Sequence, residues 1–390
     1  MLGNFIYSNP TKLYFGDKAQ QHLADALSSF GKKILLVYGG GSIKRNGVYD
    51  DVIAALKAAG KDVIELPGVM ANPTVEKLNE GRMVARENNV DFILAVGGGS
   101  TIDYAKAVSV STWYDGDAWT RFWVNQEDPE KNERIIPVGA VLTMAGTGSE
   151  MNGGSVITNH AANLKIGKVF GEEVMPKFAV LNPCYTFSLP HHQMIAGIFD
   201  MMSHIMEQYF SGDDDNTSDY LAEGLMRSVI KSSRIATLEP DNYEARSNLM
   251  WSSTWALNTL IGMGKTQDWM VHMIGHAISA YTDATHGMTL SGISVAYYRH
   301  IMKYGMNRFV RFAKEVWGIS CLDKTNEQIA NEGLDALAAW IKEIGSASEI
   351  TSLGVTAEML EDIANATIIM PGGYHKLTHA DVVEILRNSL

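Results

Sequence analysis

The sequence pattern changes once, close to residue 187, and this change constrains the fold more than any other feature. Before it, helical periodicity alternates with strand-like apolar runs, which lie near residues 32–38, 62–66, 91–96, 135–142 and 178–182. Strands that alternate with helices usually pair in parallel, with helices on both faces of the sheet. After Pro190, which suits the start of a helix, helical periodicity continues almost to the end of the chain. We therefore predict an α/β domain with a parallel sheet over residues 1–187 and an all-helical domain over residues 188–390.

Three loops of small residues follow apolar runs in the predicted α/β domain. They are Gly39-Gly40-Gly41-Ser42, Gly97-Gly98-Gly99-Ser100 and Thr143-Met144-Ala145-Gly146-Thr147-Gly148-Ser149-Glu150. The second leads directly into a predicted helix, whose N-terminus offers backbone N–H groups and a positive dipole end to a phosphate. Any one of these loops could be a plain tight turn, and neither common phosphate-binding fingerprint is present in its usual form. Three together predict one extended, phosphate-bearing ligand that lies across several strand ends.

Acidic and imidazole side chains recur at helical spacing in the second half of the chain. Asp200 and His204 stand four residues apart, as do His272 and His276, and His286 follows in a loop-like stretch between two predicted helices. Residues four apart share one helix face, with Cβ atoms about 5–6 Å apart. Each pair alone could be a polar spot on a core helix, but the surroundings are apolar and unpaired polar groups there are costly. Shared use by a divalent metal explains all three stretches, and imidazole with carboxylate suits Fe²⁺ or Zn²⁺.

Composition excludes several other classes of protein. The chain has 390 residues, 46% of them hydrophobic, and a net charge of −12, which disfavours nucleic acid or an anionic membrane as a partner. Only two cysteines are present, so we expect no disulfide framework and a reducing cytoplasmic location. No apolar run approaches the roughly 18 residues of a membrane span, and the N-terminal residues lack a signal pattern. We expect the partner to be a small molecule.

Taken together, these motifs resemble those of the iron-containing (group III) alcohol dehydrogenases. The resemblance rests on the Gly-Gly-Gly-Ser-x-x-Asp-x-x-Lys run at 97–106, the Ala-Gly-Thr-Gly-Ser-Glu run at 145–150 and the Asp/His set, and it covers nearly the whole chain. The runs at 38–44 and 152–153 resemble the branch of NADPH-dependent butanol dehydrogenases and aldehyde reductases. This resemblance implies NADP(H) with Fe²⁺ or Zn²⁺ as cofactors, a small aliphatic alcohol or aldehyde as substrate, and a homodimer.

The resemblance also implies a role for individual residues. It makes four of them metal ligands, namely Asp200, His204, His272 and His286. It places His276 beside the substrate as the catalytic proton carrier, although His276 could instead orient a ligand. The implied cofactor-binding residues are Gly39, Gly40, Gly41, Ser42, Gly97, Gly98, Gly99, Ser100, Asp103, Thr143, Thr147 and Lys165. Of these, Thr143 and Lys165 are expected near the nicotinamide, and Lys168 is close enough in sequence to replace Lys165.

Coenzyme choice can be argued from charge. Rossmann-type NAD sites place a carboxylate after a strand, where it binds the ribose 2′-hydroxyl and repels a 2′-phosphate. After Val37 this chain has Tyr38, three glycines and a serine but no acid, with Lys44 and Arg45 close behind, so we predict NADP(H) over NAD(H). The predicted reaction is hydride transfer between NADPH and a small aliphatic aldehyde. Three alternatives stay open at this point. One is an NAD-dependent polyol dehydrogenase of the same fold. The others are a metallohydrolase, which would have no use for the glycine loops, and a non-catalytic nucleotide-binding protein, which would not need the Asp/His set.

Overall fold

The computed structural model describes residues 2–212 and 215–390, and these form two compact units. One unit is Ser8–Leu189, and the other combines residues 2–7 with Pro190–Leu390. The chain therefore passes from one unit to the other two residues later than the sequence pattern indicates. The first residues also belong to the helical unit, whereas we predicted them in the α/β domain. The backbone N–H of Gly3 donates a 2.8 Å hydrogen bond to the carbonyl of Gly264, and no periodic pattern could reveal such a contact.

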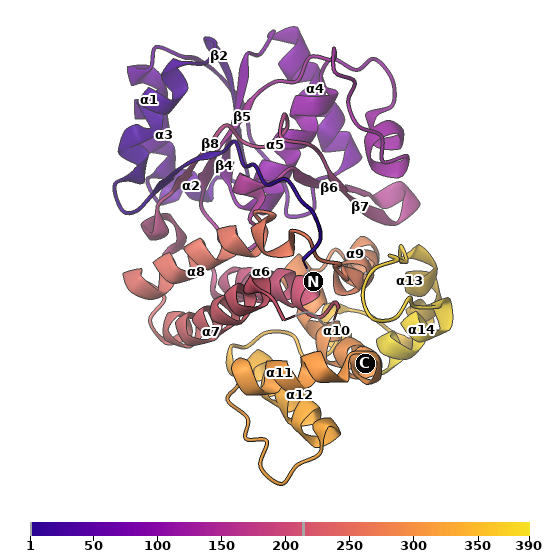
Figure 1. The fold of residues 1–390 in the computed structure, drawn as a ribbon. Helices are drawn as coiled ribbons and strands as arrows, with labels where there is room; N and C mark the ends of the chain where they lie inside the picture. The colour runs from indigo at the N-terminus through magenta and orange to yellow at the C-terminus, as the bar shows by residue number, and fades with distance from the viewer. Residues whose placement is uncertain (1, 213–214) are drawn as a thin grey trace. The chain divides into compact units, whose positions relative to one another are not determined.

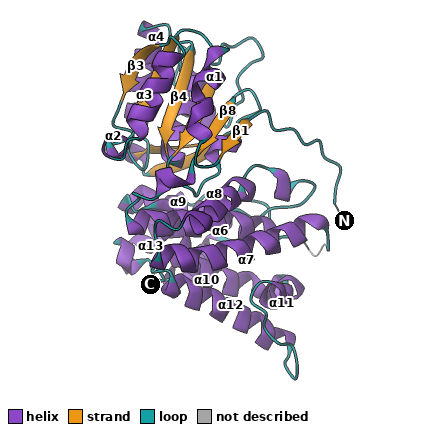
Figure 2. Ribbon diagram, turned by 90° about the vertical axis from the view of Figure 1, so that its left-hand side faces the viewer, coloured by secondary structure: helices purple, strands orange, loops and turns teal. Residues whose placement is uncertain are grey.

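The unit Ser8–Leu189 contains a six-stranded, fully parallel sheet, as predicted (Figures 1 and 2). In spatial order the strands are β1 (Lys12–Phe15), β8 (Phe178–Leu181), β5 (Val138–Leu142), β4 (Phe92–Gly97), β2 (Lys33–Tyr38) and β3 (Asp62–Leu66). Sequence analysis missed β1, which is short and only partly buried. It also missed an antiparallel hairpin of β6 (Gly154–Asn159) and β7 (Leu164–Val169), whose lysines and glycines obscure the strand pattern.

Helices cover the sheet because its central strands are buried on both faces. They are α1 (Leu23–Ser28), α2 (Ser42–Arg45), α3 (Val48–Ala58), α4 (Val75–Glu87) and α5 (Gly99–Ser111). Ile34 and Leu36 of β2 pack with residues of α1 and α3 in one core cluster. Because β2, β4 and β5 are neighbours in the sheet, the three small-residue loops that follow them lie at the same sheet edge. The chain order reverses between β2 and β4, and ligands of parallel α/β sheets bind at such a switch point.

The second unit is helical, as predicted, and α6 is its central helix. Its helices are α6 (His191–Tyr209), α7 (Thr217–Leu238), α8 (Tyr243–Ala256), α9 (Met270–Thr282), α10 (His286–Ile301), α11 (Met306–Glu315), α12 (Asn326–Glu343), α13 (Leu360–Ala366) and α14 (His379–Arg387). Every residue of α6 from Met194 onward is buried, and α6 packs against α7, α8, α9 and α10. In the described parts of the chain, no helix has the length and hydrophobicity needed to cross a membrane.

Helical periodicity does not show where individual helices of this unit begin and end. α8 ends at Ala256, and the chain then turns through Thr259, whose φ is 75°. α10 begins at His286, so this histidine lies in the first helical turn, whereas we predicted a loop-like stretch.

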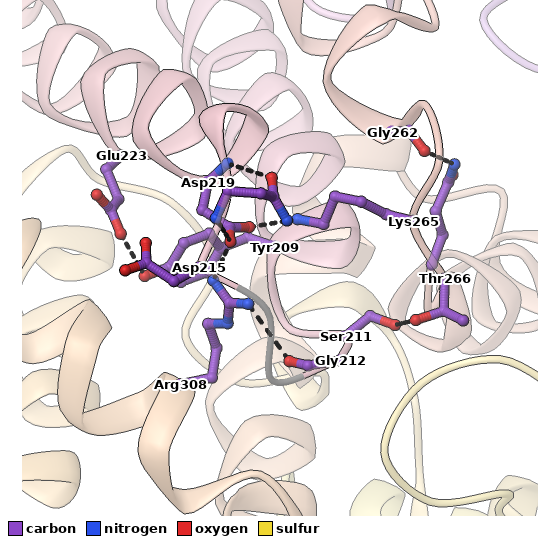
Figure 3. Close-up of polar contacts among 12 residues, drawn as sticks. Tyr209, Ser211, Gly212, Asp215, Asp219, Glu223, Gly262, Lys265, Thr266 and Arg308 are labelled. Atoms are coloured by element: carbon purple, nitrogen blue, oxygen red, sulfur yellow. Dashed lines mark hydrogen bonds and ion pairs between the residues drawn. The ribbon is translucent and has the colours of Figure 1, made fainter. Parts of the chain in front are cut away.

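A buried network of charges joins α7, α11 and the segment before α9 (Figure 3). The Asp219 carboxylate is inaccessible to solvent and lies 2.5 Å from Nζ of Lys265 and 3.0 Å from Nη1 of Arg308. Asp219 also completes the capping box of α7, because its side chain accepts a hydrogen bond from the backbone N–H of Asn216. One carboxylate thus forms ion pairs with two buried cations and fixes the start of a helix.

Candidate functional site

The four side chains that the sequence analysis assigned to a metal come together in the helical unit. Asp200 and His204 lie on α6, His272 lies on α9, and His286 is the first residue of α10. Oδ1 of Asp200 is 3.4 Å from Nε2 of His204 and 3.6 Å from Nε2 of both His272 and His286. Asp200, His204 and His272 are buried, whereas the His286 side chain is 24% exposed. One carboxylate oxygen therefore faces three imidazole nitrogens, and the exposed His286 marks the side that is open to solvent.

The spacing of these atoms fits a divalent ion. Around a tetrahedral metal with ligand distances of about 2.0–2.1 Å, neighbouring ligand atoms stand about 3.3–3.4 Å apart. The three distances from Oδ1 of Asp200 to imidazole nitrogens, 3.4–3.6 Å, are close to that value. One ligand atom each from Asp200, His204 and His272 lies within 4.8 Å of the other two, and His286 faces this group through Asp200. Nε2 of His272 has no hydrogen-bond partner among the residues that the structure describes, and an unpaired buried nitrogen is costly. The donor set suits Fe²⁺ and Zn²⁺ equally.

Close helix packing positions His286 beside the other three residues. A Cβ atom at Gly287 would lie 1.9 Å from the carbonyl oxygen of Ala196 on α6, so α10 can begin this close to α6 only with glycine there. The i, i+4 spacing on α6 places Asp200 and His204 on the same face. The imidazole of His204 stacks on that of His272, with ring centroids 4.7 Å apart.

Glu207, which sequence analysis did not identify, holds His272 in place. Its fully buried carboxylate hydrogen-bonds Nδ1 of His272, and its Oε2 accepts the His272 backbone N–H at 3.1 Å. Ser203 donates a further hydrogen bond to Oε1 of Glu207 at 2.9 Å. Burial alone would lower the pKa of His272, but Glu207 and Asp200 outweigh burial and raise that pKa to about 9. Glu207 therefore fixes the tautomer that directs Nε2 towards Asp200, as carboxylates do behind metal-bound histidines. Glu207 follows His204 by three residues and Asp200 by seven, so helical spacing could have predicted that it lies on the same face of α6.

Replacement of Glu207 by glutamine is expected to weaken metal binding about 10- to 100-fold, the usual cost of losing such a supporting carboxylate. The amide keeps the size of the side chain but cannot provide the negative charge that favours Nδ1–H on His272. Competition with a chromophoric chelator measures the affinity. Ser203→Ala, which removes only a hydrogen bond to the carboxylate, is the control and should lose much less. Wild-type affinity in Glu207→Gln would contradict this role.

His276 lies beside the ligand set without belonging to its closest group. Its ring centroid is 5.0 Å from that of His286 and 6.1 Å from that of His272, and the residue is buried. Trp269 borders the same group, with its ring 5.3 Å from the His272 imidazole. Trp269 has a left-handed backbone, with φ of 71°, an unfavourable conformation for a bulky residue and one that occurs more often at functional sites. His276 and Trp269 thus provide a titratable group and an apolar wall next to the ligand set.

In the α/β unit, the loop after β4 packs closely against the loop after β5. A Cβ atom at Gly99 would lie 2.2–2.7 Å from side-chain atoms of Thr147, so the two loops that follow β4 and β5 can touch only because residue 99 is glycine. The backbone N–H of Thr143 donates to the carbonyl of Gly97 at 3.0 Å, and Ser100 Oγ donates to the carbonyl of Ala71 at 2.5 Å. The first turn of α5, residues 99–102, contains no acid, so nothing in it opposes binding of a phosphate.

Asp103, which we predicted to bind the cofactor, makes several contacts within the α/β unit. Its Oδ1 accepts a hydrogen bond from Ser149 Oγ, and its Oδ2 accepts one from the backbone N–H of Val156 at 3.0 Å. The fully buried Lys106 lies 3.7 Å from Oδ1 and donates to the carbonyls of Ser149 and Asn152. Burial lowers the pKa of Lys106 to about 8, although Asp103 and Glu150 act in the opposite direction. These contacts indicate that Asp103 positions the loop at 143–150 against α5.

Lys165 and Lys168 have different surroundings in the structure, which the sequence spacing alone could not distinguish. Lys165 is buried on β7, and its Nζ donates to Oδ1 of Asn72 at 2.8 Å, next to the Ala71 carbonyl that Ser100 contacts. Nζ of Lys168 instead lies 2.7 Å from Oδ1 of Asp128 and 2.7 Å from the carbonyl of Gln126. Lys165 is therefore the lysine next to the loop after β4.

The loop after β2 has an acidic neighbour that we did not predict. The Glu65 carboxylate, at the end of β3, accepts hydrogen bonds from the hydroxyls of Tyr38 at 2.5 Å and Tyr49 at 2.6 Å. Nζ of Lys44 lies 3.5 Å from the same carboxylate, and these hydroxyl contacts, followed by Lys44, lower the pKa of Glu65. The acid comes from the neighbouring strand, so a search of the residues that follow β2 could not find it.

Family models match both units of the chain. The model described as iron-containing alcohol dehydrogenase matches residues 10–183, and the C-terminal model of the Fe-containing alcohol dehydrogenase family matches residues 194–390. The chain therefore belongs to the iron-containing alcohol dehydrogenase family, a family of oxidoreductases whose members use a nicotinamide cofactor and a metal.

Several relatives show how similar the chain is to other members. An NADH-dependent butanol dehydrogenase A of Clostridium acetobutylicum is 39% identical over 99% of both chains. An NADPH-dependent aldehyde reductase of Escherichia coli is 34% identical over 91% of this chain and 90% of its own. The crystal structure of an NADH-dependent butanol dehydrogenase A from Thermotoga maritima matches with a TM-score of 0.94 and 35% identity, over 100% of this chain and 99% of that one.

Proposed function

We propose that this protein is a metal-dependent alcohol dehydrogenase that interconverts small aliphatic aldehydes and alcohols with NADP(H) as the preferred coenzyme. The observation that carries the proposal is the group formed by Asp200, His204, His272 and His286, in a chain whose other unit has three small-residue loops at one sheet edge. The names of similar proteins, butanol dehydrogenase and aldehyde reductase, support the substrate class.

Each part of the chain has a defined task in this reaction. Lewis-acid polarisation of the aldehyde carbonyl is the chemistry that Fe²⁺ or Zn²⁺ supplies when held by the four ligand residues. Backbone N–H groups at Gly97–Ser100 bind the pyrophosphate, and Thr143 and Lys165 hold the nicotinamide end. A ring nitrogen of His276 delivers the proton that the alcohol product requires, since imidazole titrates near neutral pH. Trp269 provides an apolar surface for an unbranched substrate chain.

The preference for NADP(H) rests on the charges around the loop after β2. Lys44 lies on α2, which follows this loop, and its Nζ stands 4.5 Å from the ring centre of Tyr49. The carboxylate of Glu65, the nearby acid, accepts hydrogen bonds from the hydroxyls of Tyr38 and Tyr49. The loop itself offers backbone N–H groups and the Ser42 hydroxyl, which suit a 2′-phosphate. Similar proteins include both NADH- and NADPH-dependent enzymes by name, so this loop is the basis of the proposal.

Introducing aspartate at Gly39 is expected to lower the ratio of kcat/KM for NADPH to kcat/KM for NADH. Two negative groups about 4 Å apart repel by roughly 1–4 kcal/mol, which corresponds to about one to three powers of ten. A Cβ atom at residue 39 would lie 3.2 Å from the carbonyl of Val69, so Gly39→Ala is the matched control for the steric effect alone. Gly39→Ala should change both coenzymes alike. An unchanged ratio in Gly39→Asp would mean that this loop does not contact the 2′ position.

The proposed function is tested by the rate of coenzyme oxidation with butanal, in protein loaded with Fe²⁺ or with Zn²⁺. We expect turnover with at least one metal, and a higher kcat/KM with NADPH than with NADH. A higher kcat/KM with NADH would overturn the coenzyme assignment alone. Absence of turnover with both coenzymes, together with metal-dependent ester hydrolysis, would replace the proposal with a hydrolase.

A further inference from the structure

A second group of metal-ligating side chains lies in the helical unit, outside the site described above. His300 is in the last turn of α10, His375 lies in the segment between α13 and α14, and Asp381 is in the first turn of α14. Nε2 of His300 is 3.0 Å from Oδ1 of Asp381, and Nε2 of His375 is 3.4 Å from its Oδ2. One ligand atom from each residue lies within 4.8 Å of the other two.

These separations suit a small divalent cation. The two imidazoles face different oxygens of Asp381, His375 at 3.4 Å and His300 at 3.0 Å, so an ion bound between them would replace the hydrogen bond between His300 and Asp381. Two imidazoles with one carboxylate favour zinc-like transition metals over Ca²⁺ or Mg²⁺, which prefer oxygen ligands. The side chains of His300, Asp381 and His375 are 11%, 21% and 27% exposed, so a cation can reach them from solvent and is still partly shielded once bound.

Surrounding residues hold each ligand in this arrangement. Nε2 of His300 forms a 3.0 Å hydrogen bond with Oδ1 of Asp381, and its Nδ1 faces Oε2 of Glu384 at 4.0 Å. The His375 ring stacks on Tyr304 with centroids 4.3 Å apart and an interplanar angle of 11°. The preceding residue, Tyr374, anchors the segment through a 2.7 Å hydrogen bond from its hydroxyl to the carbonyl of Gly212. Thr378 donates to the Asp381 carboxylate from both its backbone N–H and its hydroxyl at 2.7 Å.

We propose that His300, His375 and Asp381 form a second divalent-metal site, selective for Zn²⁺-like ions, which cross-links α10, the segment before α14 and α14 itself. His300 is fourteen residues from His286 on the same helix, which corresponds to about 21 Å along the axis. The site is therefore too far away to contact substrate at the first metal group. It joins three segments of the helical unit, so an ion there stabilises the folded chain by mass action.

The test is the number of zinc ions bound per chain after equilibrium dialysis of the purified, metal-loaded protein against buffered Zn²⁺. The variants are His300→Gln, His375→Gln and His379→Gln. His379 is the matched control, since it is an exposed histidine beside the site whose Nε2 pairs with Glu361 at 3.7 Å. We expect wild type and His379→Gln to bind one more zinc ion than the other two variants. Added Zn²⁺ should also raise the melting temperature of wild type and His379→Gln by more than it raises that of His375→Gln.

The zinc content of His272→Ala, measured in parallel, distinguishes the second site from the first. It should lose one zinc ion on its own and a second one when combined with His375→Gln. Equal zinc content in wild type, His300→Gln and His375→Gln, with circular dichroism showing folded protein, would overturn the second site and leave the first untouched. In that case the three side chains form only a histidine–aspartate ion-pair group.

Discussion

Replacement of His272 by alanine is expected to abolish metal binding at the Asp200 group and to reduce kcat/KM for butanal by about 10³-fold or more. His272 supplies one of three imidazole nitrogens around Asp200, and it is the one that Glu207 orients. Lewis-acid stabilisation by a metal contributes several kcal/mol to the transition state, and each 1.4 kcal/mol is about tenfold in rate. Metal content by mass spectrometry and steady-state kinetics measure the two effects on the same sample.

His276→Ala is the matched comparison, because it removes an imidazole that lies one helical turn along α9 from His272. It should keep its metal and lose rate, since we assign proton delivery to His276 and metal binding to His272. Full metal occupancy and wild-type turnover in His272→Ala would show that the ligand assignment is wrong. Metal loss in His276→Ala would show instead that the roles of the two histidines are exchanged.

Replacement of Asp219 by asparagine is expected to lower the free energy of unfolding by about 3–5 kcal/mol, the typical cost of removing one partner from a buried ion pair. Asparagine keeps the volume and an oxygen for the capping box of α7, but it removes the charge that forms ion pairs with Lys265 and Arg308 (Figure 3). Urea denaturation, read as the shift of the transition midpoint at constant m value, measures the loss.

Asp215→Asn provides the control for the loss of stability expected in Asp219→Asn. Asp215 pairs with Arg311 at 2.6 Å, but its side chain is 67% exposed and solvent screens the pair, so little or no change in stability is expected. If Asp219→Asn were as stable as Asp215→Asn, the buried network would not contribute to the stability of the helical unit.

Local patterns predicted the parts of the site that come from one element. The spacing of Asp200 and His204 alone places them on one helix face. The small-residue loops can be recognised in the sequence because each follows an apolar run typical of a buried strand. Periodicity also predicted the division into an α/β part and a helical part. It could not assign residues 2–7 to the helical unit, because a backbone hydrogen bond to Gly264 leaves no trace in side-chain patterning.

Contacts between distant segments limited what the sequence could reveal. Glu207 meets His272 across 65 residues, and Glu65 reaches the loop after β2 from the neighbouring strand. The second histidine group has the same character, since His300 and Asp381 are 81 residues apart. In each case the residue type is informative only after packing has placed it beside its partner.

Deuterium transfer from reduced coenzyme to substrate tests the central claim most directly. The metal-loaded protein is incubated with butanal and NADPH that is dideuterated at C4 of the nicotinamide, and the butan-1-ol is examined by mass spectrometry. Dideuteration makes the result independent of the face from which hydride leaves. The account predicts one deuterium atom at C1 of each alcohol molecule, and about 10³-fold less labelled alcohol with His272→Ala in the same time. Alcohol without deuterium, or labelled alcohol in equal amounts from His272→Ala, would contradict it.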